Sequence, residues 1–244
     1  MRACSNVCGR KWQLSKFIGF ETGFMHRRIR MKRWIGAGLI MLLSLPGLAL
    51  AGIVEGRNYM EVPFPATVAT GKKIEVREFF WYGCPHCYVL EPGLEKWLQR
   101  MPSNAQFVRT PGTAAPAWRI HAQAYYTFEA LGVEDKWHGA FFKEVQEHHQ
   151  EFNDANGIEK FAVAHGVDKQ KFRDAFNSFG VRLKVEKAIQ LNQDLNINSV
   201  PTVVVDGRYL TSPAMAEGED QFFQVLDFLI KKAAQERKKP APQR

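Results

Sequence analysis

The stretch FFWYGCPHCYVLEPGLEKWL, residues 79–98, places Cys84 and Cys87 between an aromatic run and a pattern of regularly spaced apolar residues. Residues 72–82 form the upstream part, and their aliphatic and aromatic side chains are typical of a buried strand in a mixed sheet. Downstream of Cys84 the apolar residues recur at helical spacing, and Pro85 suits the first turn of a helix because that position needs no backbone donor. The sequence therefore predicts a strand that leads directly into a helix, with both cysteines at the start of the helix.

The spacing of the two cysteines gives them different chemistry. Positions i and i+3 lie on one face of a helix, so the sulfurs of Cys84 and Cys87 can form a bond. Cys84 also lies where backbone N–H groups have no helical partner and the helix dipole is positive, which stabilises a thiolate and lowers its pKa below about 8.5. His86 adds a donor or a positive charge beside it. The sequence therefore predicts Cys84 as an exposed nucleophile and Cys87, one turn inward, as the resolving thiol.

A stabilised thiolate favours a redox function for this pair. Each pKa unit below the ambient pH favours the reduced, ionised form by about 1.4 kcal/mol, which corresponds to roughly 30 mV for a two-electron couple. The disulfide is then a strong oxidant, whereas the loop that it closes is too short to stabilise the fold much. Two alternatives stay open at this point. One is a carrier whose two thiolates bind a soft metal ion such as Cu(I), and the other is a peptide-binding chaperone in which the cysteines are incidental.

Residues 1–51 have the features of a leader. From Met25, a basic head is followed by a short apolar stretch and by small residues that end at Ala51. These are the parts of a secretory signal, and the apolar stretch is too short to span a bilayer comfortably. We expect translation to begin at Met25 or Met31 and the signal to be cleaved after Ala51.

Removal of the leader changes both the charge and the cysteine content. Nine of the 33 Lys and Arg residues, but only one of the 25 Asp and Glu residues, precede Gly52, so the remaining chain has 24 of each. Because the basic excess belongs to the leader, nucleic acid is excluded as a partner. Cys4 and Cys8 are lost with the leader, and an exported chain with the single pair Cys84 and Cys87 is not a scaffold held together by disulfides.

The rest of the chain predicts a strand–helix framework that is interrupted by a block of helices. Residues 52–70 form an irregular lead-in, and residues 105–110 a second strand. Helices are predicted to start at Pro116, Glu134, Ile158, Asp168, Val181 and Glu219, and residues 201–210 form a hairpin around an Asp206-Gly207 turn. This order indicates an α/β fold with a helical insertion.

Three local features carry further expectations. Pro92-Gly93, inside the first predicted helix, should kink or briefly break it. Residues 237–244 are expected to be a disordered tail. The core of the helical block is expected to contain its large aromatic side chains, some of which could surround the cysteines: Trp118, Phe128, Trp137, Phe141 and Phe142.

Two residues outside the CPHC segment are candidates for the site, and each has two interpretations. Glu78 lies in the strand that leads to the cysteines, either as a buried acid near Cys87 that accepts and returns its proton, or as an exposed strand carboxylate. Pro201 opens the strand in NSVPTVVV, where a proline often marks a cis turn or else simply begins the strand.

EFFWYGCPHC, with Val-Pro-Thr downstream and a helical insertion between them, resembles the DsbA family of periplasmic thiol:disulfide oxidoreductases. The resemblance implies a thioredoxin fold with a central mixed sheet, formed by residues 52–113 and 182–236, and an inserted all-helical domain of residues 114–181. It also implies a monomeric dithiol oxidase in the periplasm of a Gram-negative bacterium, with no cofactor beyond its own redox-active disulfide. Such an enzyme passes the disulfide to unfolded exported proteins with cysteine pairs, and a quinone-linked membrane oxidase of the DsbB type reoxidises it.

The resemblance also assigns roles by position within the CPHC motif, in which Pro85 is the second residue. Cys84 would attack and donate the disulfide, and Cys87 would resolve the mixed disulfide. His86 would tune the redox potential and contact the substrate.

Outside the motif, Glu78 would match the buried acid of the family. Pro201 would be a cis-proline packed against the disulfide, and Val200 would offer backbone hydrogen bonds to an extended substrate.

Two features differ from what the resemblance predicts. Arg109 occupies the place where we expect a lysine facing the acid, and a guanidinium does not lose its charge. Pro92-Gly93 is the second departure. An isomerase or reductase on the same fold is the nearest alternative function. Isomerases of this kind carry an N-terminal dimerisation domain, and only about twenty residues separate the expected cleavage site from the first strand, which favours an oxidase.

Overall fold

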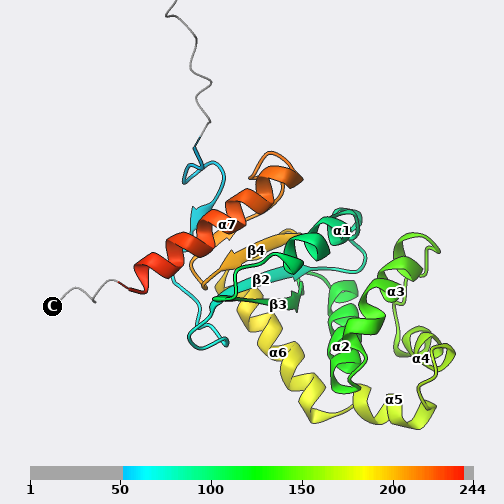
Figure 1. Ribbon diagram of the computed structural model, residues 1–244. Coiled ribbons are helices and arrows are strands. Elements are labelled where there is room, and N and C mark those ends of the chain that lie inside the picture. Colours follow the sequence, from blue (N-terminus) through cyan, green and yellow to red (C-terminus); the bar gives the residue numbers. More distant parts are fainter. Residues whose placement is uncertain (1–51, 239–244) are drawn as a thin grey trace, which may run out of the picture. The chain divides into compact units, whose positions relative to one another are not determined.

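A computed structural model describes residues 52–238 (Figure 1). The predicted signal, with Cys4 and Cys8, and residues 239–244 of the predicted tail lie outside these residues. Within the described part of the chain, no helix combines the length and the apolar character needed to cross a bilayer.

The strand predicted before the cysteines is β2 (Ile74–Phe80), an inner strand of a five-stranded mixed sheet. The strand order is β1 (Met60–Glu61), β5 (Tyr209–Thr211), β4 (Thr202–Val205), β2 and β3 (Ala105–Pro111). β3 runs parallel to β2, and β4 runs antiparallel to it. The prediction of a mixed central sheet is therefore confirmed.

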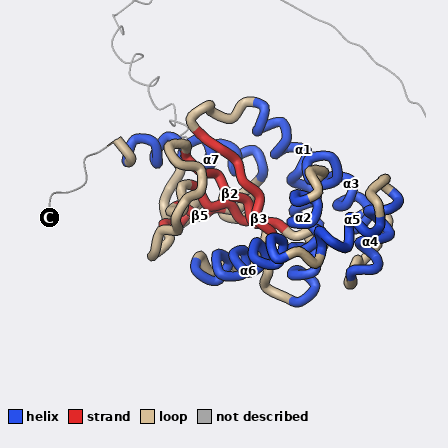
Figure 2. Tube along the Cα trace, turned by 90° about the horizontal axis from the view of Figure 1, so that it is seen from below, coloured by secondary structure: helices blue, strands red, loops and turns tan. Residues whose placement is uncertain are grey.

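Helices cover both faces of this sheet (Figures 1 and 2). α1 (Pro85–Gln99) and α7 (Glu219–Glu236) lie on one face, where Val76 of β2 belongs to a buried cluster with apolar residues of both helices. The end of α6 (Phe179–Asp194) lies on the other face, where Phe79 packs in a second cluster. Successive strand residues thus point to opposite faces, as the pleat requires.

The predicted helical block is present between β3 and α6. It consists of α2 (Pro116–Ala130), α3 (Glu134–Gln146), α4 (Ala155–Ala164) and α5 (Lys169–Phe176). Its core holds four of the five aromatic residues that the sequence assigned to it: Phe128, Trp137, Phe141 and Phe142. Phe80, Tyr82 and both cysteines of the CPHC segment are buried in the same cluster, so the active-site loop packs directly against the helical block.

Side-chain caps explain why α4 and α6 begin earlier in the chain than predicted. The side chains of Asp154 and Ser178 each accept a hydrogen bond from the backbone N–H three residues ahead. Such caps fix the first turn, so α4 and α6 begin before the predicted Ile158 and Val181. α6 runs without interruption across residues 181 and 182, where the sequence placed a domain border, so the helical block and the sheet share this helix.

Three other expectations differ from the structure. Met60 of β1 pairs with Leu210 of β5, although residues 52–70 were expected to be irregular, because a strand of two residues is too short to show alternation. α1 continues through Pro92, so the brief break that was one of the two expected outcomes is absent, while the other outcome, a kink, stays a prediction. Arg237, assigned to the tail, pairs with Asp206 and donates to backbone carbonyls at residues 71 and 72, so the ordered chain extends beyond α7.

Candidate active site

Cys84 is the N-cap residue of α1, and Cys87 lies in the first turn. The extended backbone of Cys84 (φ −92°, ψ 113°) ends the loop after β2, and Pro85 begins the helix. The backbone N–H of Cys87 points at Cys84 Sγ, 3.4 Å away. Both cysteines are free thiols in the structure. One sulfur therefore occupies the place that a serine or aspartate oxygen usually takes at a helix start.

The surroundings of the two sulfurs shift their pKa values in opposite directions. A hydrogen bond from the Cys87 thiol, backbone N–H groups of Cys87 and His86, and the charge of His86 together lower the pKa of Cys84 to about 6. Burial, followed by the interaction with Cys84, raises the pKa of Cys87. At neutral pH Cys84 is therefore mainly a thiolate and Cys87 a neutral thiol.

Cys84 is less accessible than the sequence predicts. It was expected to be exposed, but only 7% of its surface is open to solvent. The reason is the pairing of β4 with β2, which sets Thr202 opposite Phe79 and brings the residues before β4 over the cysteine. Val200 O lies 3.4 Å from Cys84 Sγ, although the two residues are 116 positions apart, and the Val200-Pro201 peptide bond is cis. A substrate protein that reacts with Cys84 must therefore approach beside the segment that contains Val200 and Pro201.

Glu78 is completely buried, which excludes the exposed interpretation. The parallel register of β2 and β3 sets it opposite Arg109, whose Nε lies 3.5 Å from Glu78 Oε2. Neither carboxylate oxygen has a hydrogen-bond partner among residues 52–238. Burial raises the pKa of Glu78 to about 8, and the charge of Glu91 acts in the same direction. Glu78 can therefore hold a proton at neutral pH, and its charge acts on Cys87.

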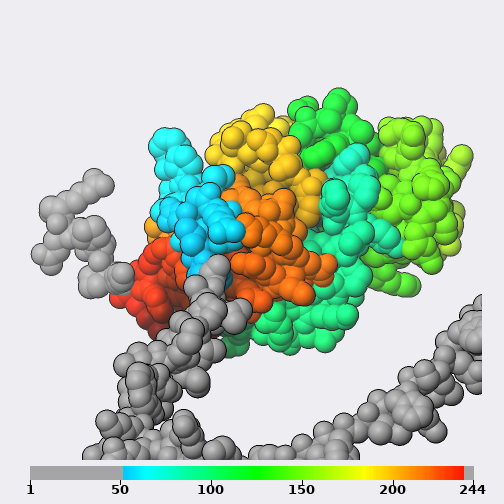
Figure 3. All heavy atoms as spheres, turned by 90° about the horizontal axis from the view of Figure 1, so that it is seen from above, coloured from blue at the N-terminus to red at the C-terminus, as the bar shows by residue number. Residues whose placement is uncertain are grey.

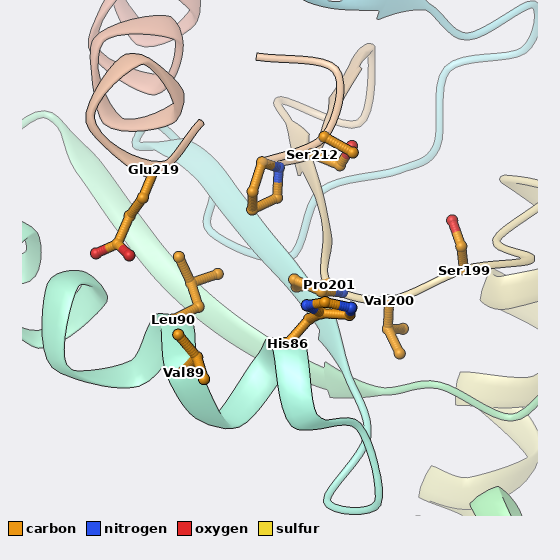
Figure 4. Close-up of a pocket in the computed structure, with 10 residues that line it drawn as sticks. His86, Val89, Leu90, Ser199, Val200, Pro201, Ser212 and Glu219 are labelled. Atoms are coloured by element: carbon orange, nitrogen blue, oxygen red, sulfur yellow. The ribbon is translucent and has the colours of Figure 1, made fainter. Parts of the chain in front are cut away.

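An apolar groove of about 380 Å³ lies beside the cysteines (Figure 4). Its lining comes from α1, from the segment before β4 and from the segment between β5 and α7: His86, Val89, Leu90, Ser199, Val200, Pro201, Ser212, Pro213, Ala214 and Glu219. In Figure 4, His86, Val200 and Pro201 lie together, and Glu219 extends from the start of α7 at the other end. Figure 3 shows the β4–β5 hairpin region (orange) directly against the α1 region (teal).

Comparison with known proteins is consistent with this arrangement. A family model described as a DSBA-like thioredoxin domain matches residues 114–229. The thiol:disulfide interchange protein DsbA of Azotobacter vinelandii is 40% identical over 183 residues, which cover 75% of this chain and 86% of that protein. DsbA of Pseudomonas aeruginosa is 35% identical over 204 residues, 83% of this chain and 97% of that protein. The crystal structure of P. aeruginosa DsbA has a TM-score of 0.73 at 36% identity and covers 76% of this chain and 97% of that chain.

The chain belongs to the DsbA family. The fold expected from the resemblance, a thioredoxin fold with a helical insertion, is thereby confirmed. The structure brings together every residue that the sequence singled out for the site. Cys84 caps α1, and Pro85, His86 and Cys87 form its first turn. Val200 O lies 3.4 Å from Cys84 Sγ, Pro201 lies beside Val200 and His86 in Figure 4, and Glu78 is close enough to interact electrostatically with Cys87.

Arg109, where a lysine was expected in a DsbA-family protein, is held by a second acid that the sequence analysis missed. Arg109 Nη2 donates to Glu91 Oε2 at 3.0 Å. His138 Nε2 lies 3.4 Å from Glu91 Oε1, and the Tyr82 hydroxyl lies 3.0 Å from His138 Nδ1. Burial lowers the pKa of His138, so the neutral ring accepts from Tyr82 and donates to Glu91. Although burial opposes it, this bond and the charge of Arg109 lower the pKa of Glu91.

This network explains how Glu78 can be protonated although Arg109 beside it is always charged. Because Glu91 carries the negative charge that balances Arg109, Glu78 need not be ionised beside a permanent cation. The position of Glu91 offered a signal: it follows Leu90 in the buried stripe of α1 that also contains Leu94. A charged residue in such a stripe requires a buried partner.

Trp118 is the one predicted core aromatic that lies at the edge of the site in this DsbA-family fold. Its ring stacks on Trp81 with centroids 4.9 Å apart and an interplanar angle of 15°. A Cβ at Gly112 would come within 2.8 Å of the Trp118 ring and 3.3 Å of a Val200 methyl group. Trp118 therefore links the helical block to the loop that covers Cys84.

Proposed function

We propose that this DsbA-family protein is a periplasmic dithiol oxidase that donates its Cys84–Cys87 disulfide to exported proteins with cysteine pairs. The observation that carries the proposal is the opposite shift of the two pKa values, about 6 for Cys84 and a raised value for Cys87. Each pKa unit by which the Cys84 thiolate is stabilised favours the reduced enzyme by about 1.4 kcal/mol and makes the couple roughly 30 mV more oxidising. The disulfide is therefore readily passed on.

The transfer proceeds in two exchanges. A client thiolate attacks Cys84 Sγ of the disulfide, the bond between Cys84 and Cys87 breaks, and a mixed disulfide between the client and Cys84 forms. A second client thiolate then attacks the client sulfur of the mixed disulfide, and Cys84 leaves as a stabilised thiolate. The client loses two electrons and two protons and gains a disulfide; the two enzyme cysteines take up the two electrons, Cys87 ends with one proton, and the other proton goes to solvent because Cys84 leaves as a thiolate.

Buried Glu78 is suited to exchange a proton with Cys87. Cys87 is a poor thiolate in its buried position, so it needs a proton as the first exchange releases it. The pKa of Glu78, about 8, is close enough to neutral for this carboxyl to donate the proton and later recover it.

The groove beside Cys84 is suited to hold the client. An extended peptide can form backbone hydrogen bonds with the segment at Val200 while apolar side chains contact Pro201 and α1. His86, which is exposed at the edge of the groove, contacts the same peptide.

The partner and the compartment belong to the proposal as well. The secretory pattern of residues 25–51 supports export to the periplasm of a Gram-negative bacterium. Catalytic turnover needs an oxidant for the reduced enzyme, for which we propose a quinone-linked membrane oxidase of the DsbB type acting on a monomer.

Equilibration with glutathione tests the proposal. The protein is incubated with defined ratios of reduced to oxidised glutathione, quenched with acid, and its free thiols are counted by mass spectrometry. We expect the pair to stay reduced at ratios that leave a structural disulfide oxidised. A strongly reducing couple would contradict the oxidase function and favour a reductase.

A further inference from the structure

The helical block reaches the acid of the active site through one side chain, His138 of α3. His138 is only 4% exposed, and each of its ring nitrogens lies beside a polar group from outside the helical block. Nδ1 is 3.0 Å from the Tyr82 hydroxyl, and Nε2 is 3.4 Å from Glu91 Oε1. An ionised carboxylate only accepts, so Nε2 carries a hydrogen and donates it to Glu91. This donation is the same whether the ring is neutral or charged.

Arg109 lies between two buried carboxylates but forms its hydrogen bond with one of them. Its Nη2 donates to Glu91 Oε2 at 3.0 Å, whereas its Nε is 3.5 Å from Glu78 Oε2. His138 and Arg109 therefore bind the two different oxygens of Glu91, and together they hold this carboxylate in one orientation. Hydrogen bonds to an ionised group are about twice as strong as those between neutral groups, so each of the two donors matters.

The charge on Glu91 decides how strongly Arg109 acts on Glu78. Burial and then the negative charge of Glu91 raise the pKa of Glu78, whereas the charge of Arg109 lowers it. Burial also raises the pKa of Glu91, and the hydrogen bond from His138 opposes this rise more than either interaction with Arg109 does. Without His138, Glu91 would lose part of its charge, and Arg109 would be free to pair with Glu78 instead.

The other titratable groups around His138 are Glu134, whose Oε1 lies 3.8 Å from Nδ1, Tyr125, whose ring centroid is 6.3 Å away, and Asp135, which acts through its charge. Of these, Glu134 also acts on Arg109, but only through its charge. The direct contacts that lead from His138 toward Glu78 therefore run through Glu91 and Arg109.

We infer that His138 is a positioning residue for the proposed reaction: by donating to Glu91 it assigns Arg109 to Glu91 and leaves Glu78 free to exchange a proton with Cys87. The helical insertion then contributes to the redox chemistry itself as well as to the covering of the cysteines. This inference rests on the proposed function.

The titration of Glu78 in the reduced protein tests the inference without a client. In protein whose glutamate side-chain carboxyls carry ¹³C, the resonance of Glu78 is the one that Glu78→Gln removes. His138→Phe keeps a ring of similar size and loses both hydrogen bonds. We expect the ratio of ionised to protonated Glu78 at pH 7 to rise about tenfold, as the loss of one hydrogen bond to a charged group implies. Thermal unfolding checks that the variant is folded.

Three further variants make the test specific. His138→Gln has an amide N–H that can replace Nε2–H, so Glu78 should titrate as in the native protein. His165→Phe is the matched control, because His165 also packs against Trp137 in the helical block but bonds to a backbone carbonyl oxygen. Glu91→Gln should shift the titration at least as much as His138→Phe does, and combining the two should add nothing, because His138 acts through Glu91.

An unchanged titration of Glu78 in folded His138→Phe would overturn the inference. An equal shift in His165→Phe, or additive shifts in the double variant, would overturn it as well, because the effect would then not pass through Glu91.

Client oxidation connects the titration to the reaction. If Glu78 gives its proton to Cys87, the rate follows the protonated fraction of Glu78. A tenfold change in the ionisation ratio then makes the rate of His138→Phe, relative to the native rate with the same client, fall about fivefold between pH 6 and pH 8. A shifted titration with a constant rate ratio would overturn the role of His138 in the reaction, whereas failure of the native protein to oxidise any client would count against the proposed function itself.

Discussion

Cys84 and Cys87 lie three residues apart at the start of α1, yet the surroundings of Cys84 stabilise a thiolate and those of Cys87 disfavour one. Around Cys84 are the Cys87 thiol, two backbone N–H groups and His86. Around Cys87 are buried apolar side chains and the carboxyl group of Glu78, which raises the pKa of Cys87 further when it ionises. The residue type is the same, so the difference lies in which donors and which solvent each sulfur reaches. A single helical turn can therefore divide the roles of nucleophile and resolving thiol.

The largest expected effect comes from removing each sulfur in turn. Both variants are first treated with oxidised glutathione. Cys84→Ser should reduce the rate of client oxidation by more than about a thousandfold, because the Cys84–Cys87 disulfide cannot form and the sulfur that the client thiolate attacks is gone. Cys87→Ser, which then carries glutathione on Cys84, should accumulate mixed disulfides with clients: the client thiolate attacks Cys84 Sγ, glutathione leaves as a thiolate, and no neighbouring thiol resolves the product. Non-reducing electrophoresis and mass spectrometry of each variant with a reduced client measure both outcomes. Mixed disulfides that formed on Cys87 in the Cys84→Ser protein would reverse the assigned roles.

Two buried glutamates of β2 offer the next comparison. Glu78 has no hydrogen bond among the described residues, whereas Glu75 accepts from Arg77 at 2.7 Å and from a backbone N–H. A carboxyl whose pKa is raised in the folded state contributes its full stability below pH 4.5 and loses it as the pH rises through about 8. Glu78→Gln should therefore match the native protein at pH 4 and be more stable at pH 8, by about 4 kcal/mol, because each pKa unit between 4.5 and about 8 contributes about 1.4 kcal/mol.

Glu75→Gln is the matched control and should lower the free energy of unfolding, by roughly 1–3 kcal/mol, because it breaks a buried ion pair. Urea unfolding of both variants at pH 4, 6 and 8 measures the difference. Equal pH profiles for Glu78→Gln and the native protein would show that the pKa of Glu78 is the same in the folded and the unfolded protein.

The sequence predicted the strand–helix framework and the cysteine positions because local patterns encode them. The run of aliphatic and aromatic residues in β2, the helical spacing in α1 and the Asp206-Gly207 turn all depend on neighbouring residues. The pleat of the strand contained the answer for Glu78, because Glu78 shares a face with Ile74 and Val76.

Other features depend on contacts that no local pattern contains. The cover over Cys84 arises from the pairing of β4 with β2, which brings Val200 to Cys84 although the two residues are 116 positions apart. The network of Arg109, Glu91 and His138 joins a strand and two helices and becomes visible only when α1 and α3 are placed together. Sequence reasoning missed the network because the buried stripe of α1 indicates only that Glu91 needs a partner, and nothing local identifies Arg109 and His138 as its partners.

The pH dependence of the reduced protein measures the Cys84 side of the comparison directly. A thiol whose folded pKa is lowered to about 6 contributes stability that is present above its ordinary pKa and is lost as the pH falls through 6. The free energy of unfolding of the reduced native protein, measured relative to that of Cys84→Ser, should therefore rise between pH 6 and pH 9, with a slope of up to about 1.4 kcal/mol per pH unit. Urea unfolding of both proteins over this range isolates the contribution of Cys84, because the opposite contribution of Glu78 is common to both and cancels in the difference.

The smallest effect separates the two sources of Cys84 stabilisation, the Cys87 thiol and His86. The thiol hydrogen bond contributes more than the charge of His86. A hydrogen bond to a charged group contributes about 1.5–3 kcal/mol, so Cys87→Ala should lower the thiolate-to-thiol ratio of Cys84 at pH 6 by roughly tenfold or more. His86→Ala should lower it less, since His86 is exposed and its charge is screened by solvent. Ultraviolet absorbance at about 240 nm follows the thiolate in each reduced variant. A larger change in His86→Ala than in Cys87→Ala would assign the oxidising power of the pair to the histidine rather than to the partner cysteine.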